Sequence, residues 1–150
     1  MIFQQLKEGR SFILRFEHEE DLLEGLKIFV EENKLQGAVF WILGALGKGK
    51  IVGGPRHNTA PPEPIFVSFE DTREIIGWGN ICRLTNKSPK IHLHLSAGRG
   101  ENTYTGCLRS DGKVFLTCEV YLREILNFPL RKKDQTWQVE LLDITGNRDS

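Results

Sequence analysis

The sequence predicts an α/β fold of the α+β type, in which a mostly antiparallel β-sheet packs against one long amphipathic helix. Short stretches of β-branched and aromatic residues alternate with polar ones along most of the chain and stop at Gly, Pro, Asn or Asp. One stretch, residues 19–34, instead repeats its apolar residues at helical spacing. A chain of 150 residues suits one domain, so we expect a single domain over 1–150 with an ordered core at 8–145.

The helix is expected over residues 19–34. Its apolar positions share one face and are Leu22, Leu23, Leu26, Phe29 and Val30. Acidic residues at 19–21 suit the positive end of the helix dipole, and Lys34 followed by Gly37 supplies a basic end and a stop. Gly25, inside the helix, indicates close packing against another backbone.

Strands are expected on both sides of this helix. They fall at 11–17, 38–43, 48–54, 65–70, 73–84 and 138–144, with three more between 91 and 122 joined by tight turns at 98–102 and 111–112. The segment 38–43 has no polar residue and should be central, covered on both faces. Residues 44–47 should turn the chain, 55–64 should form an exposed proline-rich loop, 123–128 one helical turn, and 146–150 a frayed tail.

Two histidines, His92 and His94, stand in the strand that begins at Ile91. Successive side chains of a strand point to opposite faces, so these two share a face about 6.6–6.8 Å apart along the chain. If the next turn is centred on residues 100–101, His94 lies opposite Cys107 at roughly 5 Å. Two imidazoles and a thiol suit Zn²⁺ with a fourth position open. The spacing therefore predicts a candidate metal site at His92, His94 and Cys107.

Other interpretations of these residues stay open. A slip of one residue, for which Gly106 offers a bulge position, would move Cys107 to the opposite face of the sheet. A His-x-His pair on a strand is commonly a pair of partly buried polar residues, and a free cysteine is commonly a small buried hydrophobe. His57 lies in the 55–64 loop, from which it could reach over a site, although a solvated loop histidine is the ordinary role.

Charge and motif spacing disfavour two classes of function. Twenty basic residues balance twenty acidic ones, whereas a protein that binds nucleic-acid phosphates by its own charge has an excess of basic residues. We interpret the basic clusters at 48–50 and 131–133 as solvated surface. Gly44, Gly47 and Gly49 fit neither a Gly-x-Gly-x-x-Gly nor a Walker pattern, and a strand follows them instead of a helix. Nucleotide binding by this loop is therefore not expected.

Cysteine usage and hydropathy predict the compartment. Three cysteines are an odd number and make no disulfide framework, which indicates a reducing environment. The first residues turn polar at once, and no apolar run approaches the length of a membrane span. We expect a cytoplasmic protein with no membrane segment.

Six motifs in order resemble those of the PPC domain family, the plants and prokaryotes conserved domain also called DUF296. They are the amphipathic residues 19–26, Leu-Gly-Ala-Leu-Gly at 43–47, Glu-Ile-Ile-Gly-Trp-Gly-Asn-Ile at 74–81, His-Leu-His-Leu at 92–95, Thr-Gly-Cys-Leu at 105–108 and Val-Phe-Leu-Thr-Cys-Glu-Val at 114–120. The resemblance covers almost the whole chain. It implies a stand-alone prokaryotic or archaeal type of member that assembles as a homotrimer.

The resemblance also bears on the site. It implies a divalent metal on the His-x-His strand and on a histidine of the next strand, where this chain has Cys107. Glu119 corresponds to an acidic position of the family. A two-residue turn at 111–112 would place it opposite Tyr104 on the face away from Cys107, which favours pairing at a subunit interface over a role as a general base. Plant members add AT-hooks that bind DNA, but this chain lacks their Arg-Gly-Arg core.

Two functions follow from these expectations. The first is a homotrimeric PPC-type interaction or DNA-binding domain that carries a divalent metal, with zinc expected, on His92, His94 and Cys107. The alternative is a zinc hydrolase in which the same residues hold an ion that activates water. The sequence shows no conspicuous base for such an enzyme, so it favours the first function. It identifies no substrate, DNA target or partner.

Overall fold

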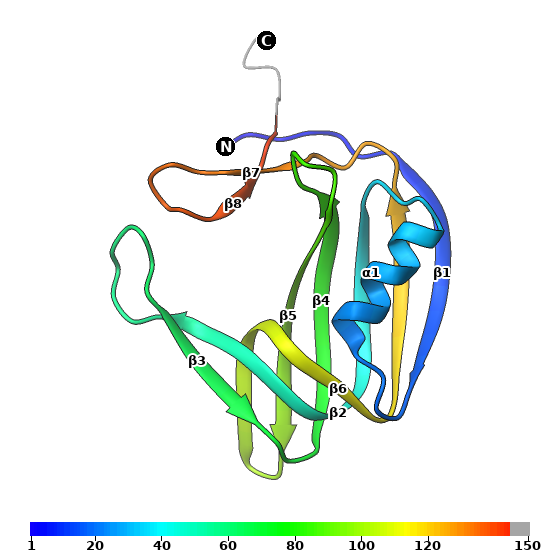
Figure 1. Cartoon of the computed structure of the whole chain (residues 1–150), viewed down its shortest axis with the longest axis vertical. Coiled ribbons are helices and arrows are strands. Elements are labelled where there is room, and N and C mark those ends of the chain that lie inside the picture. Colours follow the sequence, from blue (N-terminus) through cyan, green and yellow to red (C-terminus); the bar gives the residue numbers. More distant parts are fainter. Residues whose placement is uncertain (145–150) are drawn as a thin grey trace.

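A computed structural model describes residues 1–144 of the chain and consists mainly of β-strands with one helix (Figure 1). The tail expected at 146–150 lies outside the described residues. The elements in chain order are β1 (Glu8–Glu17), α1 (Leu22–Glu32), β2 (Ala38–Pro55), β3 (Pro64–Phe69), β4 (Arg73–Arg83), β5 (Pro89–Arg99), β6 (Asn102–Ile125), β7 (Arg131–Lys133) and β8 (Glu140–Leu142). The mostly antiparallel sheet and the single helix are confirmed.

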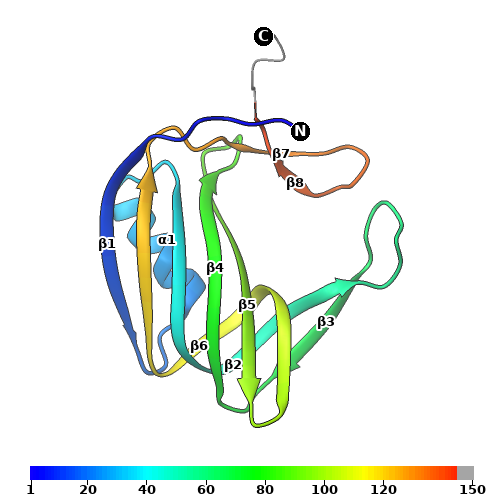
Figure 2. The same ribbon diagram turned by 180° about the vertical axis from the view of Figure 1, so that it is seen from behind.

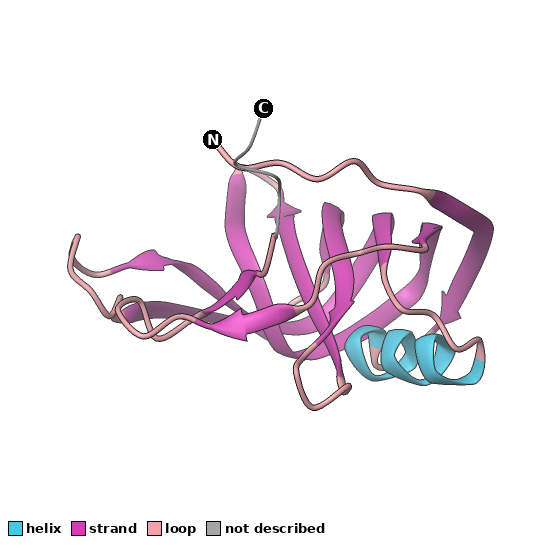
Figure 3. Cartoon of the chain, turned by 90° about the horizontal axis from the view of Figure 1, so that it is seen from above, coloured by secondary structure: helices cyan, strands magenta, loops and turns pink. Residues whose placement is uncertain are grey.

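The main sheet closes on itself because the two longest strands, β2 and β6, change neighbours along their lengths. Residues 38–44 of β2 pair with β4 on one side and with residues 118–124 of β6 on the other. Residues 46–52 of β2 pair with residues 107–114 of β6, and β3 pairs with the same half of β2. The start of β6 pairs with β5, which pairs with β4. Strands β6, β5, β4 and β2 thus form a closed circuit. Figure 3 shows the strands from above, with the helix to one side of them.

Residues with unusual backbone conformations let β2 and β6 bend while their pairing continues. Gly44 has a φ of 144°, and a Cβ there would meet the backbone oxygen of Thr117, so both backbone conformation and space require glycine. Asp111 and Leu116 of β6 have φ values of 59° and 61°, close to register shifts in the β2–β6 pairing. The turns predicted at 44–47 and 111–112 were therefore wrong, because pairing between the two strands continues past both places.

The C-terminal end of β6 corrects a further prediction. Residues 123–125 belong to this strand and pair with β1 and β2, so the helical turn expected at 123–128 was wrong. The last predicted strand is present in a shorter form, as β8, which pairs with β7.

Helix α1 has 11 residues, so the expectation of one long helix was wrong. Asp21 caps it by accepting a hydrogen bond from the backbone N–H of Glu24 at 3.0 Å. Glu19 and Lys34 lie outside the helix with φ values of 68° and 56°. The predicted apolar face is confirmed, because its buried residues are Leu22, Leu26 and Val30. Gly25 marks close packing, although against a side chain and not a backbone, since a Cβ there would meet the ring of Phe16 in β1.

The two faces of the sheet differ in what covers them. In Figure 1 helix α1 lies in front of β1, β2 and β6, and Figure 2 shows the opposite face of these strands with no helix over it. Phe40 and Ile42 are buried, whereas Trp41 and Leu43 are 49% and 47% exposed. The prediction that 38–43 is covered on both faces is therefore wrong for the single chain. Successive side chains of β2 point alternately to a covered and an open face.

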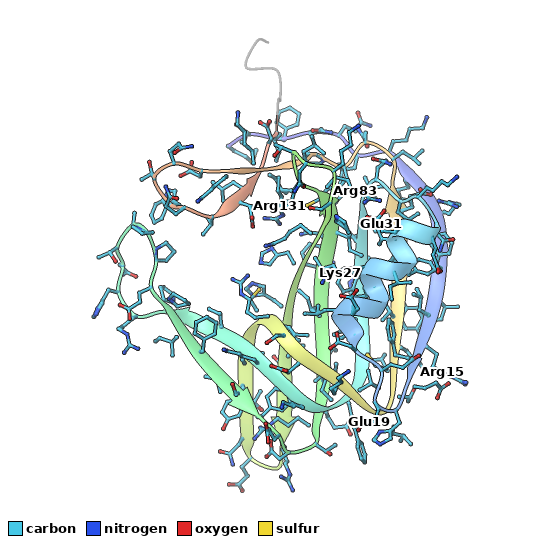
Figure 4. The ribbon with its side chains drawn as sticks, in the orientation of Figure 1. Arg15, Glu19, Lys27, Glu31, Arg83 and Arg131 are labelled. Carbon is cyan, nitrogen blue, oxygen red and sulfur yellow. The ribbon has the colours of Figure 1, made fainter. Side chains whose placement is uncertain are left out.

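Polar contacts at the end of β4 fix the helix to the sheet. Arg83 is buried and donates to the backbone oxygen of Leu35 at 2.6 Å and to Oε1 of Glu31 at 2.6 Å (Figure 4). Arg83 therefore joins β4 both to the last turn of the helix, through Glu31, and to the segment that follows the helix, through Leu35. Within residues 1–144, no helix combines the length and apolar character needed to span a membrane. The three cysteines are buried and free, and the expected cytoplasmic location stays a prediction.

One buried carboxylate joins β1 to β6. Glu124 is only 6% exposed, and it accepts hydrogen bonds from Nε of Arg10 at 2.8 Å, from Nη2 at 3.0 Å and from the backbone N–H of Arg10 at 3.1 Å. The side-chain hydrogen bonds from Arg10 lower the pKa of Glu124, against a smaller opposing effect of burial. The charged form of Glu124 is thus stabilised in the folded protein.

We predict that Arg10→Ala lowers the free energy of unfolding near neutral pH, because it leaves the Glu124 carboxylate without its partner. The pKa of Glu124 is lower in the folded chain than its ordinary value of 4.5, so the ion pair stabilises the fold above that pH. This contribution is lost as the pH falls through the folded pKa. The difference between parent and variant should therefore shrink in acid, as measured by urea unfolding across a pH series.

Arg15→Ala is the matched control, since Arg15 pairs with Glu17 on the surface of the same strand and both side chains are exposed. Exposed pairs contribute little, so this variant should stay close to the parent at every pH. An Arg10→Ala deficit that is the same in acid and at neutral pH would contradict the assignment to Glu124.

Candidate metal centre

His92 and His94 of β5 lie on one face of the sheet with their rings in contact. Their Nε2 atoms are 3.1 Å apart, and the ring centroids are separated by 4.9 Å. The predicted sharing of one face is confirmed, and both rings present the same nitrogen to a common point.

Cys107 of β6 faces the histidines across the strand pairing. His94 is the register partner of Cys107, as a turn centred on residues 100–101 predicts. The ligand atoms of His92, His94 and Cys107 all lie within 4.8 Å of one another. Gly106 is not a bulge, because it pairs in register with Leu95. Its lack of a side chain lets β2 approach, since a Cβ would meet the backbone oxygen of Val52.

The donor set and its spacing fit a divalent metal of the zinc type. Zinc binds imidazole nitrogen and thiolate sulfur, and two nitrogens on one tetrahedral zinc lie about 3.3 Å apart when each bond is about 2.0–2.1 Å. The observed Nε2 separation is close to this spacing. Cys107 is buried, His92 is partly buried and His94 is exposed, so the group is open to solvent at one side. Three protein ligands would leave one position of a tetrahedral ion free.

The surroundings keep His92 uncharged. Burial lowers the pKa of His92 to about 4, with smaller electrostatic contributions from Arg131, His94, Arg109 and Lys90. At neutral pH its ring is therefore neutral, which is the form that binds metals. Elsewhere, burial raises the pKa of the Cys118 thiol to about 12, and that cysteine is not part of the group.

Arg131 of β7 contacts the site and was missed by sequence analysis. It donates to Nδ1 of His92 at 3.1 Å, to Oδ1 of Asn80 at 3.2 Å and to the backbone oxygen of Glu140 at 2.7 Å (Figure 4). Arginine has only donors, so Nδ1 accepts and the neutral ring carries its proton on Nε2. A metal-binding imidazole usually donates its second N–H to an acceptor. Arg131 would therefore leave Nδ1 when an ion occupies Nε2.

The interpretation of 131–133 as solvated surface was thus wrong for Arg131, which is partly buried. No local motif signals this contact, because 39 residues separate Arg131 from His92 and the contact depends on how the β7–β8 hairpin folds back.

Two other candidate residues lie away from the group. Glu119 pairs in register with Leu43 and Arg15 and accepts a hydrogen bond from the Tyr121 hydroxyl at 3.1 Å. Its predicted position opposite Tyr104, on the face away from Cys107, was wrong, because β6 does not fold into a hairpin there and the strand pairing puts Glu119 on the same face of the sheet as His94. Strands β2 and β4 separate Glu119 from β5, so it is no base for this site. His57 is exposed in the proline-rich loop.

These features define a class of protein: a small α+β domain with a closed β-sheet, one helix and a His-x-His strand facing a cysteine. The family model of the Plants and Prokaryotes Conserved (PCC) domain matches residues 3–126. The chain therefore belongs to this family, which is the PPC family that its motifs resemble. No curated protein is similar enough in sequence to count as a match.

Solved structures share the fold. A metal-containing protein from Archaeoglobus fulgidus matches with a TM-score of 0.82 and 24% identity, over 95% of this chain and 99% of that one. A plant- and prokaryote-conserved (PPC) protein from Pyrococcus horikoshii matches with a TM-score of 0.77 and 24% identity, over 94% and 99%. A Ralstonia eutropha JMP134 protein, named "putative DNA-binding protein", matches with a TM-score of 0.71 and 17% identity, over 87% and 88%.

Proposed function

We propose that this chain is a PCC domain that works as a homotrimer and carries a divalent metal. The ion that we expect is zinc, held by His92, His94 and Cys107. The observation that carries the metal assignment is the convergence of the three ligand atoms within 4.8 Å. The Archaeoglobus fulgidus protein of the same fold is described as metal-containing, which supports a metal in this fold. Cysteine in place of the third histidine keeps a zinc ligand at that position.

Protein purified in the presence of Zn²⁺ should hold one metal ion per chain by elemental analysis. His94→Ala and Cys107→Ser should each weaken Zn²⁺ binding by at least about 100-fold, because losing even a residue that supports a ligand costs about 10–100-fold. Titration against a competing chelator measures the affinity, and bound Zn²⁺ should protect Cys107 from thiol reagents.

His57→Ala is the matched control, since it removes an exposed histidine outside the group and should leave Zn²⁺ binding unchanged. Sub-stoichiometric metal in the parent protein, or full affinity in both ligand variants, would remove the metal assignment.

The zinc-hydrolase alternative has no supporting observation in the described structure. Within residues 1–144, no carboxylate joins the His-His-Cys group, and Glu119 lies across two strands from it. A hydrolytic site needs a base within hydrogen-bond reach of the attacking water. The proposal therefore assigns a bound metal and no hydrolysis.

A continuous apolar surface supports the assembly. Residues that face each other across paired strands lie on one side of the sheet. The register joins Ile13 to Tyr121, Tyr121 to Trp41, and Trp41 to Trp78, across β1, β6, β2 and β4. Leu43 and Ile76 are paired in the next row. All six side chains are exposed in the single chain. We call these six residues the open apolar face, and exposed faces of this kind mark interaction surfaces.

A second copy of the chain is the occupant that the proposal assigns to the open apolar face. The same cross-strand row continues from Trp78 to His94 and from His94 to Cys107. The open apolar face therefore ends where the candidate metal site begins. Glu119 and Tyr121 hydrogen-bond to each other within this surface and supply its polar pair. Subunit contact and metal site would share one border.

The parent protein should sediment at three times its chain mass of 17.1 kDa, and Trp41→Glu should sediment as a monomer. A charge at the centre of the open apolar face would be buried without a partner, which costs several kcal/mol per subunit. Ile76→Glu, at a position 69% exposed in the single chain, should act in the same way. Sedimentation velocity measures the mass and circular dichroism checks the fold.

Ile28→Glu is the matched control, because Ile28 is an exposed apolar residue of α1, away from the open apolar face. It should leave the assembly intact. A parent protein that sediments as a monomer would contradict the homotrimer.

Duplex DNA binding by the assembled protein is the second candidate, favoured by the name of the Ralstonia eutropha structure. With twenty basic and twenty acidic residues, binding would depend on a local basic patch. We predict binding that weakens at least about tenfold as salt rises from about 50 to about 200 mM, measured by fluorescence anisotropy. Absence of binding at the lower salt concentration would remove this candidate.

A further inference from the structure

Two cavities meet at the His-His-Cys group. A basic cavity of about 550 Å³ is lined by His92 together with Lys90, Arg109, Arg131 and Lys133. An apolar cavity of about 510 Å³ is lined by His94 and Cys107 together with Val52, Pro55, Pro62 and Pro64. Arg109 and Val139 line both cavities, so the two spaces adjoin. Each volume suits part of a small organic molecule.

The basic cavity has an excess of positive charge. Lys90 pairs with Glu140 at 2.9 Å, and Glu140 is the only carboxylate among the residues that line this cavity. Arg109, Arg131 and Lys133 form no ion pair within the part of the chain that the structure describes. Three cations in one concave space, in a protein whose net charge is zero, favour an anionic ligand.

Arg131 brings a guanidinium charge to the wall of the basic cavity. Its two terminal nitrogens donate to a ring nitrogen of His92, the amide oxygen of Asn80 and the backbone oxygen of Glu140, and none of these acceptors is a carboxylate. Carboxylate and phosphate oxygens are the acceptors that a guanidinium binds most strongly.

The apolar cavity offers a different surface. Its proline walls have no N–H to donate, and its remaining aliphatic walls come from Val52 and Val139. Val52 lies at the end of β2, next to Gly53 and Gly54, and is the register partner of Cys107. Such a surface takes an apolar group and gains by excluding water from it.

We infer that this site binds a small organic anion, with a carboxylate or phosphate in the basic cavity and a compact apolar body in the apolar cavity. The inference rests on the proposed function in that it names the ligand class of the proposed metal centre. The contacts that hold the anion are separate from the metal ligands, because Arg109 bridges the two cavities and is not one of those ligands.

Isothermal titration calorimetry of the full chain tests this inference, with the protein both metal-free and loaded with Zn²⁺. Benzoate and phenyl phosphate are the probes, and they distinguish a carboxylate from a phosphate site. At least one should bind at least about tenfold more tightly than benzamide, which lacks the charge, and than acetate and inorganic phosphate, which lack the apolar body.

Arg109→Gln should weaken binding of the preferred probe at least about tenfold, because it removes a charge-assisted hydrogen bond. Arg15→Gln is the control, since it removes an exposed charge of β1 that lines neither cavity, labelled in Figure 4, and should leave probe binding unchanged. The inference is overturned if neither probe binds, or if Arg109→Gln binds as tightly as the parent.

The two proposals fail separately. Zn²⁺ uptake without binding of either probe would overturn the anion site and leave the metal centre standing. Probe binding that depends on Arg109 in a protein that takes up no Zn²⁺ would remove the metal centre and support the anion site.

Discussion

Strands β2 and β6 pair along almost their whole lengths, and the rest of the fold depends on this pairing. Both strands bend, β2 at Gly44 and β6 near Asp111, and each bend lets a strand take a second neighbour. The first half of β6 thereby reaches β5, while its second half stays beside β1 and the first half of β2. The sheet closes, and its closed circuit includes the β5–β6 hairpin, in which Cys107 lies opposite His94.

The same pairing gives the sheet two unlike faces. Alternation along β2 buries Phe40 and Ile42 in the core and leaves Trp41 and Leu43 on the open apolar face. Because neighbouring strands are in register, this face continues to His94. A surface that suits a second copy of the chain and a group that suits a metal ion therefore share one border.

The positive charge at the site comes from a few residues around it and not from the net charge of the chain. The chain as a whole carries no net charge, yet the β7–β8 hairpin brings Arg131 and Lys133 to the cavity that Lys90 and Arg109 also line. Burial together with the charges of Arg131, Arg109 and Lys90 keeps His92 neutral, which suits a metal ligand, and the cations of this cavity suit an anion. This hairpin lies after residue 126, where the match to the family model ends.

The sequence by itself determined what depends on near neighbours: the helical face of Leu22, Leu26 and Val30, and the common face of His92 and His94. With a turn centred on residues 100–101, it also determined the register of Cys107. Only the tertiary structure decided that β2 continues past Gly44, that β6 continues past Asp111 and that Arg131 lies beside His92. Local turn preferences are worth about 1 kcal/mol or less, so long strand pairings override them. No local pattern specifies which distant segment will supply such a contact.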